Sequence, residues 1–567
     1  MKLTQYLLLR KTQIFFILLL STWCTLQAQE PQKVEIRSGY TEKRPELPDA
    51  IIYTKDADGQ VYIVHEGVEM WCDQAYLYPD DNFVRAYGNV FLTQGDTISL
   101  RSKYTEYNGN NQLAFARGDV FLQETNTILE SEVLYFDRNR QQAFYDTGGT
   151  VKDSSTVLNS KIGRYFTENK KYQFLDNVHI QHPEYELKSE HVDFFTESGD
   201  AYLYGPSTII GDNTQVYSER GFYQTRQNHG YFIRNARVDY DSRTLFGDSI
   251  YFDENRNFAS ASNNIRVLDS INESKITGHY AEVYKEKDSV IITKNPIVAS
   301  KRDTDSLYVH ADYLIITGEE DRRIVNAYPD ARFIRKDILG KEEPMSGKAD
   351  SIYVDEQKGL MKLLRRPIVW SGENQMTGDT IQMIYDTIAK QMDTLKVYNN
   401  AFIVFPDTLS GGYNQIKGQH LIGLFTENNL DSIKINRNTE VLFYTRDEKD
   451  SLIGIDNTLS SAIEIYIIEN EIKGVRFIRN VKGKIYPESM LPKNARLLPG
   501  FKWYGDERIE TVEDLLKGKP EILLPEIKGL EPPLEVEDFF NKTIPPSEDL
   551  PTNNNQMGHL PEEENPE

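Results

Sequence analysis

The chain has 567 residues, of which 39% are hydrophobic and 27% are charged, and its formal net charge at pH 7 is −23. Aspartate and glutamate outnumber lysine and arginine by 87 to 64, so the composition excludes a broadly basic nucleic-acid-binding protein. Only two cysteines occur, Cys24 and Cys72, which excludes a fold held by a disulfide framework.

The first 28 residues have the layout of a secretory signal peptide. Three cationic residues precede the apolar run Ile14–Leu20, and the small residue Ala28 follows, after which we expect cleavage. A transmembrane anchor is the alternative, but the run is short against roughly 30 Å of hydrocarbon. A second alternative is acylation of Cys24, which the bulky Trp23 before it disfavours. Export is therefore expected, with residues 29–48 as a linker.

A repeated phrase fills the chain from residue 49 to residue 410. RAYGNVFLTQ (Arg85–Gln94) is followed by FARGDVFLQE (Phe115–Glu124). Each copy of the phrase has a central pair of residues, Gly-Asn in the first and Gly-Asp in the second, and we call the residue after this pair the anchor. The anchors are Val90, Val120, Thr150, Val178, Ser207, Ala236, Ile265, Pro296, Ala331, Pro367 and Ala401. A second phrase places a small residue in five successive steps of 29: Ser102, Ser131, Ser160, Ser189, Ser218 and Gly247. This regularity indicates a repeat protein built from one supersecondary unit.

Each unit contains two alternating runs of about ten residues, joined by polar turns such as Asn108–Asn110. Within Leu113–Gln123 the even-numbered residues are small or aliphatic and point to one face, and the same pattern returns in residues 259–267. Alternation with a period of two predicts β-strands. The Gly, Asn or Pro in mid-strand predicts a bend.

These units predict an all-β fold, an elongated open β-jellyroll or β-sandwich stack of antiparallel hairpin repeats of about 30 residues. A single hairpin is marginal in water, so neighbouring units must stabilise one another. The alternative is a parallel β-helix. Paired runs joined by turns of the NGNN type favour antiparallel hairpins.

One face of the stack is consistently apolar, which predicts a trough. The residues expected to line it, as candidates for a lipid groove, are Val90, Leu92, Val120, Leu122, Val178, Ile180, Ile265 and Val267. Such a trough suits a ligand with several alkyl chains, since each buried CH₂ contributes about 0.8 kcal/mol. An ordinary packed core without a ligand remains the alternative. A strand slip of one residue would invert the whole set.

The C-terminal part departs from the regular repeats. Residues 411–500 are interpreted as a degenerate continuation of the repeats. Residues 501–519 are expected to be a short helical segment, with one helix over Glu507–Lys519. Residues 520–567 hold nine of the 23 prolines and many carboxylates, which predicts a disordered acidic tail.

No residue pattern points to catalysis. HIQH (His179–His182), with His191 nearby, is the one histidine cluster, and on a strand His179 and His182 point to opposite faces. No Gly-x-Ser-x-Gly motif or phosphate-binding loop occurs. We therefore expect no enzyme, no catalytic residue, no metal site and no cofactor.

The pattern [Ile/Leu]-x-[Ser/Gly]-[Asp/Glu/Lys]-x-x-x-x-[Tyr/Phe], followed by Ala-x-[Gly/Asn]-[Asn/Asp]-Val-x-Leu, resembles the OstA-like family. That family includes LptA and the periplasmic part of LptD. The resemblance covers roughly Ile51–Phe405 and continues weakly to Pro487. It implies a slightly twisted β-jellyroll whose hydrophobic groove carries the acyl chains of lipopolysaccharide. The chain differs from the short single-jellyroll members in its length, its expanded late repeats and its acidic tail.

On this resemblance we expect a periplasmic protein that binds and transports lipopolysaccharide between the inner and outer membranes. The alternative is a structural or assembly β-repeat protein of the cell envelope with no lipid ligand. Expected partners are lipopolysaccharide or a related lipid, other jellyroll transport proteins or a second copy joined by edge-strand addition, and an outer-membrane partner. The edge at Ile51–Val64 is expected to accept the added strand, unless Gln29–Pro48 folds back and covers it.

Overall fold

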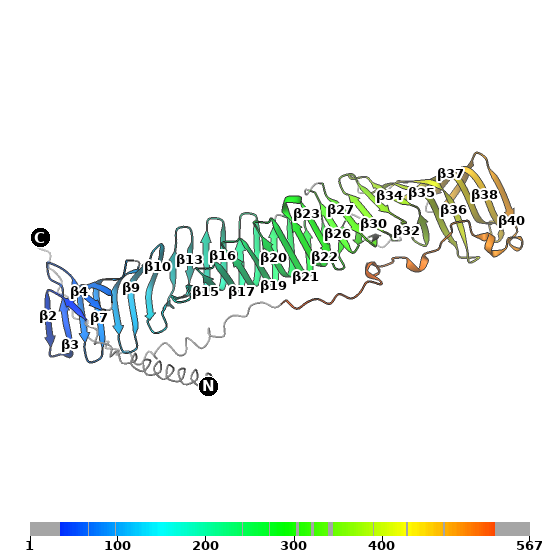
Figure 1. Ribbon diagram of the computed structural model, residues 1–567. Coiled ribbons are helices and arrows are strands. Elements are labelled where there is room, and N and C mark those ends of the chain that lie inside the picture. Colours follow the sequence, from blue (N-terminus) through cyan, green and yellow to red (C-terminus); the bar gives the residue numbers. More distant parts are fainter. Residues whose placement is uncertain are drawn as a thin grey trace, which may run out of the picture. The chain divides into compact units, whose positions relative to one another are not determined.

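The computed structural model describes residues 34–527, except residues 66, 97, 241, 272, 302–304, 319–321, 338–343, 389–390, 427–428 and 469–470. The expected signal peptide and most of the expected acidic tail therefore lie outside the described residues. The chain divides into two compact units, Met1–Gly199 (unit 1) and Asp200–Glu567 (unit 2). The described part of unit 1 consists of β-strands joined by turns, and that of unit 2 of β-strands with five short 3-10 turns (Figure 1).

The described residues of unit 1 form sixteen strands: β1 (Glu35–Arg37), β2 (Tyr40–Arg44), β3 (Leu47–Thr54), β4 (Val61–His65), β5 (Val68–Cys72), β6 (Gln74–Tyr78), β7 (Phe83–Gln94), β8 (Ile98–Asn108), β9 (Leu113–Glu124), β10 (Thr127–Asp137), β11 (Gln142–Tyr145), β12 (Gly149–Lys152), β13 (Val157–Ser160), β14 (Ile162–Phe166), β15 (Lys171–His182) and β16 (Tyr185–Phe195).

Unit 2 contains β17 (Asp200–Ile210), β18 (Thr214–Gln224), β19 (His229–Tyr240), β20 (Arg243–Asp253), β21 (Phe258–Asp269), β22 (Ser274–Tyr284), β23 (Ser289–Thr293), β24 (Ile297–Lys301), β25 (Asp305–His310), β26 (Tyr313–Thr317), β27 (Ile324–Tyr328), β28 (Ala331–Asp337), β29 (Met345–Ala349), β30 (Ser351–Asp355), β31 (Leu360–Leu364), β32 (Ile368–Ser371), β33 (Asn374–Thr377), β34 (Thr380–Tyr385), β35 (Met392–Asp407), β36 (Gly412–Thr426), β37 (Asn429–Arg446), β38 (Leu452–Ile468), β39 (Glu471–Ile478) and β40 (Lys482–Tyr486). Its 3-10 turns are η1 (Lys285–Lys287), η2 (Glu488–Met490), η3 (Lys493–Arg496), η4 (Gly505–Glu507) and η5 (Glu513–Leu516).

Successive long strands pair as antiparallel hairpins. In unit 1, β9 pairs with β8 on one side and with β10 on the other, and in unit 2, β19 pairs in the same way with β18 and β20. Each hairpin therefore continues the ladder of its neighbour. The all-β stack of antiparallel hairpins is confirmed, and the parallel β-helix is not the fold of these strands.

The predicted mid-strand bend is confirmed, and it has a specific backbone form. Two consecutive residues adopt a left-handed conformation, for example Asp176 (φ 58°) and Asn177 (φ 54°) in β15. The ladder shifts at that point, since Leu175 pairs with His191 but Val178 pairs with Ser189. Asn, Asp and Gly tolerate this region best, which explains the central pair of each repeated phrase. Equivalent pairs include Gly88–Asn89, Gly118–Asp119, Arg234–Asn235, Asn263–Asn264, Asn399–Asn400, Arg437–Asn438 and Arg479–Asn480.

The small residue of the second phrase lies opposite this bend. Ser131 pairs with Val120, and Ser189 pairs with Val178. The hydroxyl of Ser160 donates to the carbonyl of Ile162 at 2.9 Å, and that of Ser189 donates to the carbonyl of His191 at 3.1 Å. These hydroxyls satisfy backbone carbonyls where the ladder is interrupted, which gives a physical reason for serine in successive repeats.

Two predictions near the N-terminus are wrong. Residues 34–48, expected to be linker, contain β1, β2 and the start of β3. β1 pairs with β4 and β2 pairs with β3, so the predicted free edge at Ile51–Val64 is already occupied. The alternative, in which the preceding residues fold back over that edge, is the observed arrangement. Its physical reason is that a bare strand edge leaves backbone hydrogen bonds unmade.

The helix predicted over Glu507–Lys519 is also wrong. That range holds one 3-10 turn, η5, together with the last residue of η4, in an otherwise extended segment. A free helix of this length is marginal, and here backbone contacts with unit 2 hold the chain extended.

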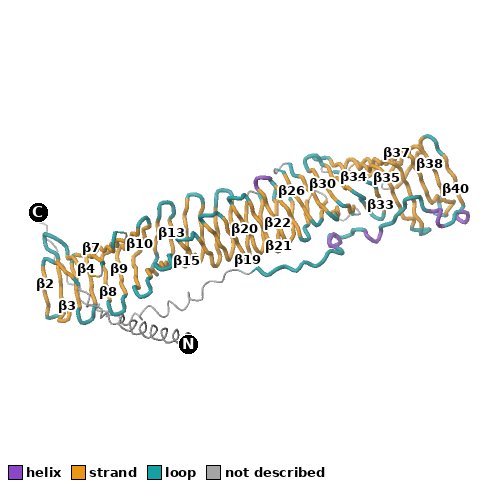
Figure 2. Tube along the Cα trace, viewed as in Figure 1, coloured by secondary structure: helices purple, strands orange, loops and turns teal. Residues whose placement is uncertain are grey.

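These contacts belong to a longer element, the return segment, defined as Pro487–Ile527. It follows β40 and passes back along the earlier strands of unit 2 (Figures 1 and 2). Its contacts with the strands run from Gln415 to Gln375, then to Arg332 and finally to Asn263. The segment therefore runs along the strand stack.

Candidate lipid groove

The eight candidate groove residues fall into two groups. Val90, Val120, Val178 and Ile265 directly follow the bend and are only 1–2% exposed. Leu92, Leu122, Ile180 and Val267 lie two residues further along the same strands and are half-buried. All eight share one face of their strands, because the strand period is two. Packing is therefore complete at the bend and looser beyond it.

The second group belongs to a continuous aliphatic row that crosses unit 1 from strand to strand. The row is defined by residues that pair directly in register: Ile36, Ile63, Met70, Leu92, Leu100, Leu122, Leu129, Val151, Leu158, Ile180 and Leu187. Adjacent strands lie about 4.8 Å apart, so the row forms an unbroken apolar strip.

Sequence reasoning found three of these eleven residues, Leu92, Leu122 and Ile180. Four others precede a small residue of the second phrase by two positions: Leu100, Leu129, Leu158 and Leu187. That constant offset was the signal that could have identified these four.

Unit 2 has an equivalent row, which changes character along its strands. Ile209, Val216, Val238, Leu245, Val267, Ile276 and Val298 are half-buried. From Val309 onward the row is closed: Val309, Phe333, Val369 and Ile403 are 1–4% exposed. A Cβ on Gly347, between Phe333 and Val369 in register, would lie 2.5 Å from the Phe333 ring. The aromatic ring fills the inner space there.

The wall that faces the row changes in the same direction. In the first strands of unit 1 it consists of small residues, with Ala75, Ala86, Thr105 and Ala116 in register, and larger residues such as Leu134 and Tyr145 follow. In the late repeats of unit 2 the equivalent positions are large and 0–1% exposed: Ile381, Val397, Leu421, Ile435 and Ile463. The first strands of unit 1 therefore carry smaller side chains on this wall than the late strands of unit 2 do.

The opposite face of unit 1 carries an aromatic ladder. Tyr76, Tyr87, Tyr104, Phe115, Tyr135 and Phe144 follow one another with ring centroids 4.9–6.2 Å apart. Arg117 covers Tyr104 at 4.6 Å from its centroid. Aromatic and cationic groups thus stabilise the outer face, and the aliphatic residues face inward.

The return segment binds the outer face of the late strands. Gln415 donates from Nε2 to the carbonyl of Arg496 at 2.8 Å and accepts the N–H of Leu498 at 2.8 Å. Gln375 does the same, donating to the carbonyl of Lys502 (2.8 Å) and accepting the N–H of Tyr504 (2.7 Å). Further along, Ile509 and Leu515 pack on Ile334, and Lys519 forms ion pairs with Asp312 and Asp330. The return segment therefore covers the outer face of the late strands around Gln375, Val404 and Gln415.

The histidines do not form a shared site. His179 pairs with Glu186 at 2.6 Å, whereas His191 pairs with Asp193 at 2.7 Å. Among the described residues no group of three or more His, Cys, Asp or Glu side chains could hold a metal ion.

His191 instead belongs to a buried polar cluster with Asp193, Lys171, Gln173 and Arg164. Burial raises the pKa of the Asp193 carboxyl, but the hydrogen bond from His191 and the charges of His191 and Lys171 outweigh it and hold the pKa below its ordinary value. Burial also lowers the pKa of Arg164 to about 10. Lys171, Gln173 and His191 all hydrogen-bond to the Asp193 carboxylate, so we assign the cluster a structural role.

Two family models match the chain. Residues 34–190 match a model described as OstA-like protein. Residues 275–391 match a model described as LptA/(LptD N-terminal domain) LPS transport protein. The chain is thus similar to OstA-like proteins over the first range and to the LptA/LptD N-terminal family over the second. The first match covers nearly all the described residues of unit 1, and the second covers the strands of unit 2 around the point where the aliphatic row closes. The resemblance inferred from the repeated phrases is confirmed for these two segments, and neither description names an enzymatic activity.

Fifteen solved chains match this chain. One is the crystal structure of LptH, the LptA homologous periplasmic component of the lipopolysaccharide transport device from Pseudomonas aeruginosa. It is 15% identical, with a TM-score of 0.13, over 23% of this chain and 76% of that chain. No curated protein matches. Among the described residues no helix is long and apolar enough to cross a membrane.

Proposed function

We propose that this OstA-like protein binds lipopolysaccharide in the periplasm and takes part in its transport between the inner and outer membranes. The two matched family descriptions support the lipopolysaccharide-transport role. The observation that carries the finer proposal, acyl-chain binding, is the aliphatic row. It runs unbroken through unit 1, with six of its eleven members half-buried and the other five 7–8% exposed.

The row suits acyl chains because of its continuity. An alkyl chain lying across the strands meets an aliphatic side chain about every 4.8 Å. Each methylene that leaves water contributes about 0.8 kcal/mol, so several chains on one lipid resist loss to solvent. The polar head of such a lipid stays at the open side.

The groove is expected to serve lipid only where the row is half-buried. That range includes unit 1 and, in unit 2, the strands up to β24 (Ile297–Lys301). From Val309 onward large side chains fill the inner space, and the return segment covers part of the outer face. We therefore assign no acyl-chain binding to these late strands.

Neighbouring proteins are expected to join at the N-terminal edge. Because β1 and β2 cover the strands behind them, the available edge is β2, where every residue is exposed. Strand addition by a jellyroll partner or a second copy would pair with this edge. An outer-membrane partner and cleavage after Ala28 remain parts of the same proposal.

A second candidate function is a structural β-repeat protein of the cell envelope with no lipid ligand. The specific observation in its favour is that inner-face residues already pack on one another, as Val61, Met70, Ala86 and Val90 do in one core cluster. A filled inner face needs no ligand.

A photo-crosslinking residue distinguishes the two functions. Placed at Leu122 or Val267, on the aliphatic row, it is expected to trap lipopolysaccharide in cells. Placed at Phe121 or Arg266, one residue earlier on the opposite face, it is expected to give no more than background. Equal labelling at inner and outer positions, or none at either, would favour the structural function.

A further inference from the structure

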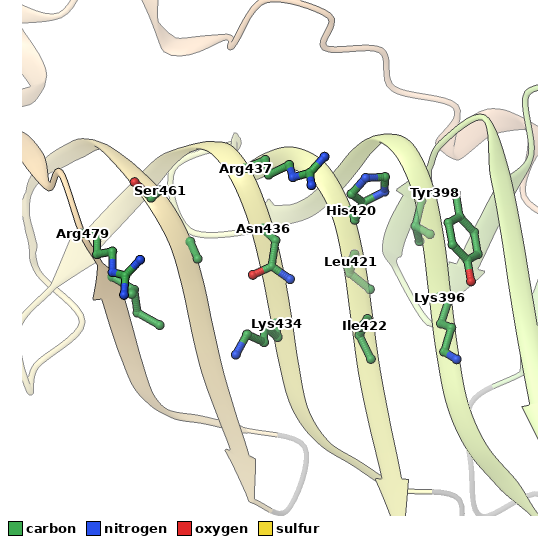
Figure 3. Close-up of a pocket in the computed structure, with 13 residues that line it drawn as sticks. Lys396, Tyr398, His420, Leu421, Ile422, Lys434, Asn436, Arg437, Ser461 and Arg479 are labelled. Atoms are coloured by element: carbon green, nitrogen blue, oxygen red, sulfur yellow. The ribbon is translucent and has the colours of Figure 1, made fainter.

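A pocket of about 740 Å³ lies in unit 2 on the strands β35 to β39. Its polar lining includes Lys396, Tyr398, His420, Lys434, Arg437 and Arg479 (Figure 3). No aspartate or glutamate lines it, although carboxylates outnumber lysine and arginine in the chain. The pocket is thus a local concentration of positive charge in a protein of strongly negative net charge.

The pocket lies on the outer face of these strands. Tyr398, His420, Asn436 and Ala462 follow one another in register. They alternate along their strands with the inner residues Val397, Leu421, Ile435 and Ile463, which are 0–1% exposed. The site is therefore separate from the aliphatic row.

The hollow has a local cause in the sequence. Ala462 and Ser461 are small, and Ala462 pairs with the larger Asn436 and Ile478 on the neighbouring strands. Arg437 and Arg479 are each the first residue of a left-handed pair, with φ of 67° and 55°. Figure 3 shows these two arginines at the bends, with Lys434 and Lys396 further along their strands.

Most of this charge is not neutralised within the protein. Lys434 forms an ion pair with Glu464 at 2.9 Å. Lys396, Arg437 and Arg479 pair with no carboxylate of the residues that the structure describes. Three cations held near one another without counter-charges repel, and an anionic ligand relieves that repulsion.

We propose that this basic pocket binds a phosphorylated saccharide headgroup. Guanidinium groups match phosphate oxygens in a bidentate geometry, and ammonium groups add point charge. A volume of about 740 Å³ exceeds the need of one inorganic phosphate and is in the range of small-molecule ligand sites. Tyr398 and Asn436 add a hydroxyl and an amide that can hydrogen-bond to a sugar.

Binding of this headgroup does not require the groove. The pocket and the aliphatic row lie on opposite faces of the sheet, so a ligand without acyl chains tests the pocket alone. A suitable probe is an acyl-free glucosamine disaccharide that carries two phosphates, with inorganic phosphate and the unphosphorylated disaccharide as comparisons.

The decisive measurement is isothermal titration calorimetry on the full chain. The double variant Arg437→Gln/Arg479→Gln is expected to weaken binding of the bisphosphorylated disaccharide at least tenfold. The matched control is Arg234→Gln/Arg365→Gln, which removes two arginines from the same position of other bends and changes the net charge equally. This control is expected to bind within twofold of the wild type.

Several outcomes would overturn the proposal. These are no binding by the wild-type protein, equal loss in both double variants, equal affinity for the unphosphorylated disaccharide, or binding of inorganic phosphate as tight as that of the probe. Since the probe lacks acyl chains, each of these results leaves crosslinking at Leu122 unaffected. Failure of the pocket and failure of the groove are therefore distinguishable.

Discussion

Gln375 and Gln415 flank Val404 in one lateral row of unit 2, and each holds the return segment through both ends of its side-chain amide. Both side chains are at most 1% exposed. Each side-chain amide gives the return segment one hydrogen-bond donor and one acceptor, which the backbone of a neighbouring strand would otherwise have supplied. The segment is thereby fixed as an extended chain on a sheet face, in place of a strand at a sheet edge.

Replacement of Gln415 by leucine is expected to loosen the return segment. It leaves the N–H of Leu498 and the carbonyl of Arg496 without partners in a buried place, at a cost of about 1–3 kcal/mol. Hydrogen exchange at Leu498 should accelerate, while exchange in unit 1 stays unchanged. Gln215→Leu, at an exposed position of β18, is the control. Unchanged protection at Leu498 would show that apolar contacts alone hold the segment.

The bend at Gly118 is expected to reject a side chain. Gly118 has φ of 81°, and an added Cβ would lie 2.9 Å from the Cβ of Lys103. Gly95 also has positive φ, but nothing lies within 4 Å of its added Cβ. Gly95→Ala should cost about 1 kcal/mol from backbone conformation, and Gly118→Ala about 2–3 kcal/mol because a contact is added. Urea denaturation midpoints compare the two, and equal shifts would contradict the role of the close approach.

Acid is expected to weaken unit 1 through Asp193. Because the folded pKa of Asp193 is lowered, its stabilisation is present above about pH 3.8 and is lost as the pH falls through the folded pKa. Asp193→Asn should therefore cost roughly 3 kcal/mol near neutral pH and progressively less below pH 4. Thermal melting across this range measures the difference.

The control for this pH dependence is Asp119→Asn, which removes an exposed ion pair with Lys103. The Asp119 side chain is 76% exposed, so the change should cost under about 1 kcal/mol. A difference between wild type and Asp193→Asn that stays constant from pH 7 to pH 3 would contradict the assigned role of the carboxylate.

Strand addition is expected at β2 and not at the strands behind it. Tyr40 is 66% exposed in β2, whereas Tyr62 lies in β4, where it pairs with Arg37 of β1. A photo-crosslinking residue at Tyr40 should capture a jellyroll partner or a second copy in cells, and the same residue at Tyr62 should capture much less. Crosslinks at Tyr62 alone would mean that β1 and β2 detach when a partner binds.

The sequence by itself determined the repeat, the strands and their bends. Alternation with a period of two sets which residues share a face, and the left-handed preference of pairs such as Asp176–Asn177 sets where each strand turns. These are local properties of the backbone, so they can be read without knowing what lies nearby. The inward direction of Val90 and Val120 followed from the same alternation.

Only the tertiary structure decided what covers each face and edge. Gln415 binds Arg496, 81 residues away, and Gln375 binds Lys502, 127 residues away. In the sequence both glutamines are ordinary polar strand residues, and Glu507–Lys519 has the composition of a helix. Tertiary contacts also decide that β1 covers the first edge and that Arg437 and Arg479 line one pocket. Contacts between distant segments depend on register and on competition among all available partners, and local sequence preference does not contain that information.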